Sequence, residues 1–444
     1  MNKLTILHLK KFVISFGLLA CIVAILIPSV GYTDELNSGD TSWILTSTAL
    51  VLFMTLPGLA LFYAGLVRSK NVVSVLIQCF AIACIVSVAW VVYGYSLAFK
   101  GDGAYIGDFS ALFLSGIGRD SMSGSIPESV FIMFQMTFAI ITPALVVGAF
   151  AERMKFGAMC LFSLLWFTIV YLPACHMVWG GGFLGQAGVT DFAGGLVVHL
   201  TCGVGALVAA LVLGPRKGFP NTPMPPHNRT MVVIGASMLW VGWFGFNAGS
   251  AVAADSSAGM AMLVTHISAA VGALTWMGIE WIKQGKPTVV GIATGMVAGL
   301  ATITPAAGTV GPEGALLIGF LAGVICFYAT QLIKSVLKID DSLDVFPVHG
   351  VGGMLGIIML SFLGTEGGFL GSAAAGLSDQ AQGSSINQLL IQLKGIVVIG
   401  GWTAVASWLI LKLIGLITDL RVNEDQEYDG LDITLHGERS INSE

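Results

Sequence analysis

Two apolar stretches of the sequence each carry an aspartate followed by a histidine. The first, DFAGGLVVH, runs from Asp191 to His199, and the second begins DVFPVHG, with Asp344 and His349. Ionisable side chains within membrane segments usually face the interior of the helix bundle, pair with one another and mark a transport pathway. These four residues are therefore the candidates for a functional site.

Each residue type also has a structural interpretation. Asp191 and Asp344 stand at the starts of apolar segments, where a carboxylate can accept from the free N–H groups of a helix and offset its dipole. A single buried histidine can be a satisfied interior hydrogen-bonding group. A neutral imidazole can equally donate to and accept from a small polar molecule and hold a proton transiently. Because acidic substrates would require Arg or Lys, and alkali ions rings of oxygen ligands, the histidines favour a small weak base or water.

The elements that must hold these residues are membrane-spanning helices. Of the 444 residues, 55% are hydrophobic and only 10% charged, which is too little polar surface to cover a soluble globule of this size. The seven cysteines lie in apolar stretches without CxxC spacing, so we expect neither a disulfide framework nor a zinc site. The sequence has no HExxH motif, nucleophile elbow or phosphate-binding loop, which argues against an enzyme, and we expect no cofactor.

Eleven segments are apolar over a length that can cross about 30 Å of hydrocarbon. They lie near residues 43–66, 72–99, 129–150, 157–179, 195–213, 231–252, 257–282, 288–304, 314–333, 345–363 and 389–416. The histidines belong to the fifth and tenth segments, and aligning them also aligns Gly203 with Gly353 and Gly214 with Gly364. Segments five apart run in opposite directions, so the pattern predicts an all-α polytopic membrane protein with inverted five-helix halves, about 43–213 and 231–363, plus an extra helix at 389–416.

The chain ends predict a leader and a tail. Lys3, Lys10 and Lys11 precede an apolar run that is followed by small residues, which is typical of a signal peptide at 1–31. The alternative is an uncleaved first span, which the length of the apolar run favours. We expect a transmembrane domain at 32–418 and a polar regulatory tail at 419–444.

Basic residues set the orientation. With the mature N-terminus outside, the outer loops hold only Lys100 and Arg119, with Lys394 near an outer end. The inner loops hold Arg68, Lys70, Arg153, Lys155, Arg216, Lys217, Arg229, Lys283, Lys286, Lys334 and Lys338. This asymmetry predicts a multi-pass protein of the plasma (inner) membrane with its C-terminus in the cytoplasm. The inner loop at 214–229 is either a plain connection or a docking loop.

Longer motifs resemble a known family. They are FQMTFAIITPALVVGAFAERM (134–154), HMVWGGGFL (176–184), DFAGGLVVH, WFGFNAGSA (243–251), DVFPVHG and the tail LRVNEDQEYDGLDITLHGE (420–438). These resemble the family of ammonium transporters, methylammonium permeases and Rhesus proteins, and most of all its bacterial ammonium transporters, from about residue 40 to 440. The resemblance implies a homotrimer with one pore in each subunit.

The resemblance also implies an aromatic entrance. It assigns Phe138, Trp179 and Ser250 to an outer ammonium-recruitment site, and Phe138 and Phe246 to a gate of two stacked rings. Phe134 lies one helical turn before Phe138, on the same side of the third span. Aromatic faces attract a partly desolvated cation by up to about 2 kcal/mol. Ordinary packing is the alternative for each ring taken alone.

Below the entrance, the resemblance assigns His199 and His349 to the pore. It gives Asp191 a supporting role beneath the recruitment site. By its position before His349, Asp344 is the candidate acidic residue of the second stretch. Moving a bare cation into a dry medium costs tens of kcal/mol. Neutralising an amine-like acid of pKa about 10 at pH 7 costs about 4 kcal/mol, at 1.36 kcal/mol per unit. We therefore expect ammonium to lose its proton near the gate and to pass as ammonia; whether the proton follows over the histidines stays open.

Some positions depart from the family pattern. Cys202 stands where a very small residue is usual and Val264 where many members carry Asn, which leaves His266 unexplained. Thr294 fits a position facing the inner vestibule, and His176 is interpreted as structural. His199 and Cys202 share a helix face at i and i+3, so a zinc or copper site is an alternative, although the expected metal complement is none.

A second class of function is a sensor. Some relatives signal ammonium availability, and the tail together with the 214–229 loop could dock a PII-type nitrogen-signalling protein. The sequence carries no kinase or output domain after the last span, which favours the transporter. Methylammonium is the nearest alternative substrate, and nucleic acid is not expected as a partner.

Overall fold

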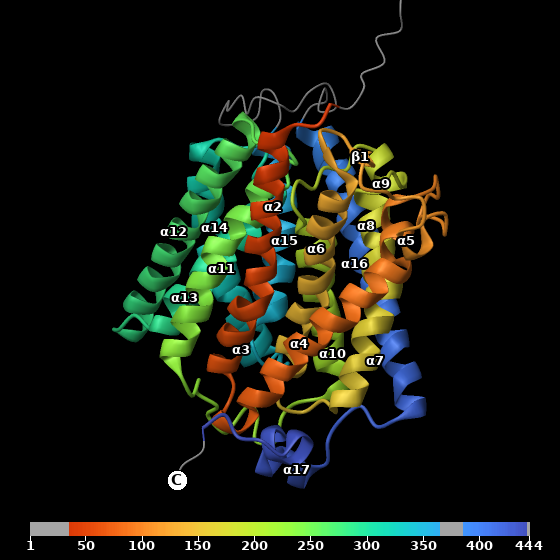
Figure 1. Cartoon of the computed structure of the whole chain (residues 1–444). Helices are drawn as coiled ribbons and strands as arrows, with labels where there is room; N and C mark the ends of the chain where they lie inside the picture. The colour runs from red at the N-terminus through yellow and green to blue at the C-terminus, as the bar shows by residue number, and fades with distance from the viewer. Residues whose placement is uncertain (1–34, 365–384, 442–444) are drawn as a thin grey trace, which may run out of the picture. The chain divides into compact units, whose positions relative to one another are not determined.

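The computed structural model describes residues 35–364 and 385–441. The chain divides into a unit that ends at Leu36 and a second unit that begins at Asn37, and the second unit contains the fold described below. The predicted signal peptide at 1–31 lies outside the described residues. Within the described part of the chain, eleven helices are long and apolar enough to cross a membrane (Figure 1).

The first five spans are α-helices, several of them interrupted by a π-helical turn. They comprise α2 (Ser38–Phe53), η1 (Met54–Leu59) and α3 (Ala60–Leu66); η2 (Ser69–Asn71), α4 (Val72–Ala89), η3 (Trp90–Gly94) and α5 (Tyr95–Phe99); α6 (Glu128–Phe150); α7 (Phe156–Trp166), η5 (Phe167–Tyr171), α8 (Leu172–Val178) and α9 (Phe183–Gln186); and η6 (Gly195–Leu200) with α10 (Thr201–Leu213). The loop after the second span holds η4 (Leu112–Leu114) and a small antiparallel hairpin of β1 (Met122–Ser123) and β2 (Ile126–Pro127), in which Met122 pairs with Pro127.

The remaining spans follow the same plan. They comprise α11 (Arg229–Gly249); α12 (Ser256–Gln284); α13 (Val289–Ile303) with η7 (Thr304–Ala306); α14 (Pro312–Gln331) with η8 (Leu332–Val336); η9 (Phe346–Gly350) with α15 (Val351–Leu363); and α16 (Ser385–Ile417). The short α17 (Glu424–Asp429) and η10 (Asp432–His436) come after the last span. All eleven predicted segments are confirmed, and the largest difference is the fourth, which ends at Gln186 because α9 adds a turn.

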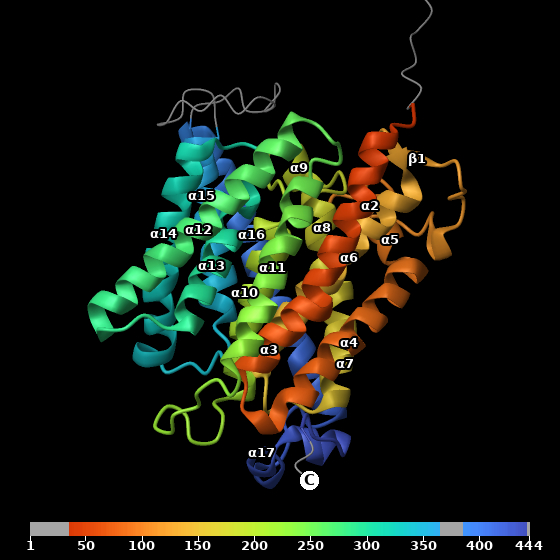
Figure 2. The same cartoon turned by 60° about the vertical axis from the view of Figure 1, so that its left-hand side comes forward.

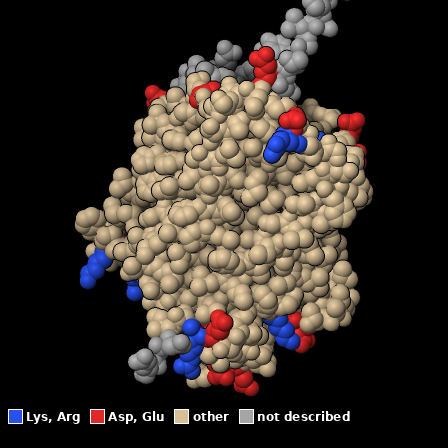
Figure 3. All heavy atoms as spheres, in the orientation of Figure 1, with Lys and Arg blue, Asp and Glu red and all other residues tan. Residues whose placement is uncertain are grey.

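Charged side chains gather at the two ends of the helices. On the face shown in Figure 3, a broad middle zone carries almost no Lys, Arg, Asp or Glu, and the charged groups lie above and below it. Several spans begin with a side chain that accepts from the first backbone N–H groups, namely Asn37, Asn228, Asp255 and Thr288. Such caps satisfy donors that have no partner inside the helix. Together with the eleven long apolar helices of the described residues, this charge distribution agrees with the predicted polytopic membrane fold.

The fifth and tenth spans pack against each other with backbone touching backbone. A Cβ added to Gly203 would lie 2.4 Å from the N and Cα atoms of Gly350, and one added to Gly353 would lie 2.7 Å from the carbonyl oxygen of Gly195. Glycine therefore permits a separation that any side chain would prevent. Both spans begin with a π-helical turn that contains the candidate histidine, and such turns are frequent at functional sites.

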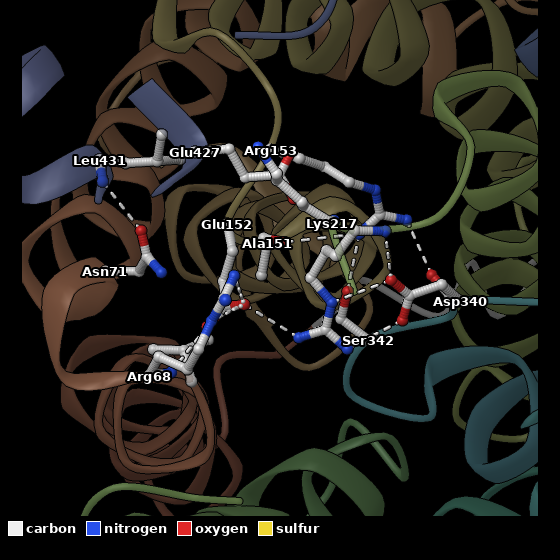
Figure 4. A network of polar contacts seen from close by, with 12 residues as sticks. Arg68, Asn71, Ala151, Glu152, Arg153, Lys217, Asp340, Ser342, Glu427 and Leu431 are labelled. Carbon is white, nitrogen blue, oxygen red and sulfur yellow. Dashed lines mark hydrogen bonds and ion pairs between the residues drawn. The ribbon is translucent and has the colours of Figure 1, made fainter. Parts of the chain in front are cut away.

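A buried ionic cluster joins the loops at the end of the bundle near α17 (Figures 2 and 4). Glu152 is almost fully buried and pairs with Arg68 at 2.8 Å and with Arg216 at 3.0 Å, while Arg216 also pairs with Asp340 at 2.8 Å. Burial would raise the pKa of Glu152, but the two guanidinium groups outweigh it, so its pKa lies below the usual value. The cluster links the loops after the first, third, fifth and ninth spans.

The tail is tied to the same cluster. The backbone N–H of Lys217 donates to the Glu427 carboxylate at 2.6 Å, and Arg421 pairs with the same carboxylate at 2.6 Å. The backbone of Leu431 donates to the Asn71 side chain at 2.9 Å (Figure 4). The 214–229 loop therefore holds the tail as well as connecting two spans.

Candidate functional site

The two histidines meet where the fifth and tenth spans cross. The Nδ1 atoms of His199 and His349 are 3.2 Å apart, and the two rings lie at 26° with their centres 5.2 Å apart. Because a neutral imidazole has one N–H, one ring donates to the other. Among the described residues, Nε2 of His199 has no hydrogen-bond partner although it is buried. This nitrogen is free to bond a small polar molecule.

A narrow apolar cavity of about 10 Å³ lies beside the pair. It is lined by the two histidines, by aliphatic side chains and Met54, and by the aromatic residues Phe62, Tyr63, Trp243 and Phe246. Its size is close to the minimum for one water molecule. A second cavity, of about 220 Å³, lies on the side of His349 that faces Thr294, Lys334 and Asp344. His349 lines both cavities, so it stands between the narrow space and the wider one.

A row of aromatic rings continues from His199 in the other direction. The ring centres of His199 and Phe246 are 5.9 Å apart, those of Phe246 and Phe138 are 4.4 Å apart, and those of Phe138 and Trp179 are 6.0 Å apart. Phe138 and Phe246 are almost fully buried, whereas Trp179 is partly exposed. Phe138 on α6 and Phe246 on α11 were expected to form a gate of two stacked rings, but their planes are tilted by 38°.

The other aromatic and hydroxyl candidates flank this row. The ring of Phe134 lies 5.1 Å from that of Phe138, edge to face. Trp179 donates its indole N–H to the carbonyl oxygen of Asp191 at 2.8 Å. Ser250, partly exposed at the end of α11, donates to the Phe246 carbonyl oxygen at 2.8 Å, which leaves its lone pairs available to an N–H donor.

Asp191 caps the fifth span. Its Oδ1 accepts from the backbone of Gly194 and Gly195, and its Oδ2 accepts from Leu196 and Val197, at 2.6 to 3.1 Å. Gly194 makes this possible by adopting a φ of 118°, a left-handed conformation that favours glycine. The capping interpretation of Asp191 is confirmed, and the same geometry fixes the start of the helix that carries His199.

The corresponding interpretation of Asp344 is wrong. Its carboxylate pairs with Lys334 at 2.8 Å, and Asp341 instead accepts from the backbone of Phe346 at 2.7 Å. The histidine alignment contains the signal for this assignment, because Asp191 and Asp341 each precede their histidine by eight residues, whereas Asp344 precedes His349 by five. Burial, and to a lesser extent the neighbouring Asp344, raise the pKa of Asp341 to about 6.

Three further positions named in the sequence analysis, Thr294, His176 and His266, lie in different surroundings. Thr294 lines the wider cavity with His349, as expected. His176 is buried with its ring nitrogens 3.0 and 2.6 Å from the carbonyl oxygens of Ala98 and Gly103, which fits a structural role. His266 instead lies on the exposed side of α12, with its ring centre 5.1 Å from that of Trp240.

The fold and the site together define a polytopic membrane protein with two histidines in contact inside its helix bundle. Residues 42–441 match the Ammonium Transporter Family. The chain is 43% identical to an ammonium transporter of Aquifex aeolicus, over 96% of this chain and 99% of that one, and 44% identical to an ammonium transporter of Bacillus subtilis, over 91% and 99%.

Solved structures of other proteins have the same fold as this chain. The crystal structure of Saccharomyces cerevisiae Mep2 aligns with a TM-score of 0.80 and 37% identity, covering 88% of this chain and 89% of that one. A structure described as a sensor Amt protein aligns with a TM-score of 0.83 and 27% identity, covering 90% and 98%. The chain belongs to the ammonium transporter family.

Proposed function

We propose that the protein takes up ammonium at an aromatic entrance, removes its proton and conducts ammonia past His199 and His349. The observation that carries the proposal is the buried histidine pair, joined at 3.2 Å: both rings line the narrow cavity, and His349 also lines the wider one. Two neutral imidazoles at this position can exchange hydrogen bonds with a molecule that both donates and accepts.

Recruitment is assigned to Trp179, Phe138 and Ser250. The Trp179 ring is partly exposed and meets the edge of Phe138, so an arriving cation finds an aromatic surface where water is still present. Cation–π attraction of up to about 2 kcal/mol and the free lone pairs of Ser250 stabilise ammonium at this point. Asp191 contributes by fixing the helix start, since its oxygens are already engaged by four backbone N–H groups.

The buried rings of Phe138 and Phe246 then exclude the charged form. A dry constriction penalises a bare cation by far more than the approximately 4 kcal/mol that deprotonation at pH 7 costs. Ammonium can therefore cross as ammonia, whereas potassium has no proton to lose. Ammonia that leaves the pair enters the wider cavity beside His349, Thr294 and Asp344, where it regains a proton from water.

The orientation and assembly belong to the same proposal. The excess of basic residues in the loops near α17 supports an orientation with α17 and the ionic cluster in the cytoplasm and the mature N-terminus outside the inner membrane. In this orientation the aromatic entrance faces outward, which suits ammonium uptake for nitrogen utilisation. Assembly as a homotrimer with one pore in each subunit follows from the family resemblance. Methylammonium, a slightly larger amine with the same acid–base chemistry, would share the path.

The test is uptake of labelled methylammonium into proteoliposomes, with unlabelled ammonium as competitor. Wild type and His266→Ala, which alters a histidine on the exposed side of α12, should take up the label, and ammonium should inhibit that uptake. His349→Ala should lose the uptake. Equal uptake by His349→Ala and His266→Ala would contradict the assignment of the pore.

A second candidate, an ammonium sensor acting through a PII-type cytoplasmic partner, is supported by one observation. The tail helix α17 is held against the 214–229 loop by Lys217, Arg421 and Glu427, so a protein that binds this surface would contact both segments. Ammonium binding without transport, together with partner binding that depends on ammonium, would favour the sensor.

A further inference from the structure

Where the fifth and tenth spans cross, the two pore histidines have a third donor beside them, the thiol of Cys202, which the proposed conduction of ammonia does not use. Cys202 is fully buried, and one donor atom from each of His199, Cys202 and His349 lies within 4.8 Å of the others. Cys202 follows His199 by one helical turn and donates weakly to its carbonyl oxygen at 3.4 Å. The cluster therefore offers a thiol and two imidazoles in one place.

The backbone fixes this arrangement. Gly203 lies against Gly350, so the residues next to them, Cys202 and His349, are held close together by two helices that touch without side chains between them. The two histidine Nδ1 atoms, 3.2 Å apart, can share an ion to which each bonds at about 2.0 Å. Little backbone movement is required for a three-coordinate site.

The charge and the softness of these donors select the ion. A thiolate with two neutral imidazoles favours a soft ion such as Cu(I) or Ag(I). A monovalent ion and one thiolate cancel each other's charge, which suits a dry interior. Zn(II) would leave a net positive charge and normally takes a fourth ligand.

We propose that His199, Cys202 and His349 bind one soft monovalent metal ion and that the bound ion blocks the pore. The ion enters from the cavity of about 220 Å³ that His349 lines. As the sulfur–metal bond forms, the thiol proton leaves to water, the imidazoles bind through nitrogen lone pairs, and no redox change occurs. The adjacent cavity of about 10 Å³ has no room for ammonia to pass around the ion. The blocking step depends on the proposed function, whereas metal binding does not.

Binding is tested on the purified full-length protein with Ag(I) in chloride-free buffer. Excess small monothiol is added to remove silver from single cysteines, and the silver retained after desalting is measured by mass spectrometry. Wild type and Cys326→Ala, which alters another buried thiol, should each retain one silver ion per chain. Cys202→Ala should retain none, and X-ray absorption of the wild-type complex should show both sulfur and nitrogen ligands. Equal retention by Cys202→Ala, or a shell of sulfur alone, would overturn the proposal.

Blocking is tested by methylammonium uptake in proteoliposomes. Cys202→Ala should take up the label as wild type does, because alanine is smaller than cysteine and adds no polar group to the pore, and this uptake also shows that the variant is folded. Ag(I) should abolish uptake by wild type and leave Cys202→Ala active. Absence of uptake by wild type before silver is added would contradict the proposed function alone, whereas uptake by wild type that silver does not change would contradict the block.

Discussion

Replacing Asp191 by Asn should destabilise the protein far more than replacing Asp344 by Asn. Both carboxylates precede a histidine, yet Asp191 accepts from four buried backbone N–H groups, whereas the carboxylate of Asp344, among the residues that the structure describes, pairs only with the partly exposed Lys334. An amide has one acceptor atom where a carboxylate has two. In Asp191→Asn, the amide nitrogen would face two N–H groups that have lost their acceptor.

The expected loss of unfolding free energy follows from the number of N–H groups left without an acceptor. Leaving a buried donor unsatisfied costs about 1 to 3 kcal/mol, so two of them lower the free energy of unfolding by about 2 to 6 kcal/mol. The Lys334 and Asp344 side chains are 29% and 21% exposed, and an ion pair of this kind contributes about 0 to 1 kcal/mol. Asn also tolerates the φ of 62° found at Asp344, so the control adds no backbone strain.

The assay is unfolding by SDS in mixed micelles, followed by far-ultraviolet circular dichroism for wild type and both variants. The account predicts a loss of at least about 2 kcal/mol for Asp191→Asn and of less than about 1 kcal/mol for Asp344→Asn. If the two variants lost the same free energy, or if Asp191→Asn matched wild type, the carboxylate would not be what holds the start of the fifth span.

Three further predictions concern the packing and the inner end of the bundle. Burial raises the pKa of Asp341 to about 6, above its usual 3.8 in the unfolded chain, so this carboxyl lowers the stability of the fold by about 3 kcal/mol as pH rises from about 4 to 6, at 1.36 kcal/mol per unit. Carboxylates with a lowered pKa, such as Glu152, act in the opposite direction, so unfolding is compared between wild type and Asp341→Asn: wild type should lose about 3 kcal/mol relative to the variant over this range, and equal pH dependence of the two would exclude Asp341 as a source. Gly203→Ala should lose methylammonium uptake and about 1 to 3 kcal/mol of stability, because the added Cβ would collide with Gly350. Gly401→Ala is the control, since a Cβ there meets no described atom within 4 Å, and it should match wild type in uptake and thermal unfolding. Glu427→Gln should release α17, because the buried carboxylate of Glu427 holds both Lys217 and Arg421. Trypsin should then cleave the tail faster than in the control Glu424→Gln, since the side chain of Glu424 is 83% exposed. Equal cleavage rates would show that Glu427 does not hold the tail.

The eleven spans and the two candidate histidines could be predicted from the sequence for physical reasons. A helix must be apolar over a fixed length to cross a membrane, so the eleven segments could be read directly. His199 and His349 stood out because ionisable groups are costly inside such segments. The glycines that aligned with them also allow the close contact between the two spans, since Gly203 and Gly353 both lie against backbone of the opposite span.

Features that depend on contacts between distant segments could not be read in the same way. Hydropathy does not report the angle between two helices, so the 38° tilt of Phe138 against Phe246 emerged only from the fold. Arg216 and Asp340 are 124 positions apart, and charge in the loops indicated orientation without indicating partners. The role of Asp341 was different: its spacing of eight from His349 was visible in the sequence, but the nearer Asp344 matched the ordinary pattern of a helix cap.

The most direct test of ammonia conduction past the histidines is a simultaneous record of membrane current and internal pH in proteoliposomes after an ammonium jump, with potassium as the control ion. Wild type should respond to ammonium and remain silent to potassium, and His199→Ala should lose the response or its selectivity. A current would show that charge crosses with ammonia, and internal alkalinisation without current would show passage of ammonia alone; both agree with deprotonation at the gate. A wild-type signal no larger than that of empty liposomes, with ammonium still bound to the protein, would contradict conduction and favour the sensor.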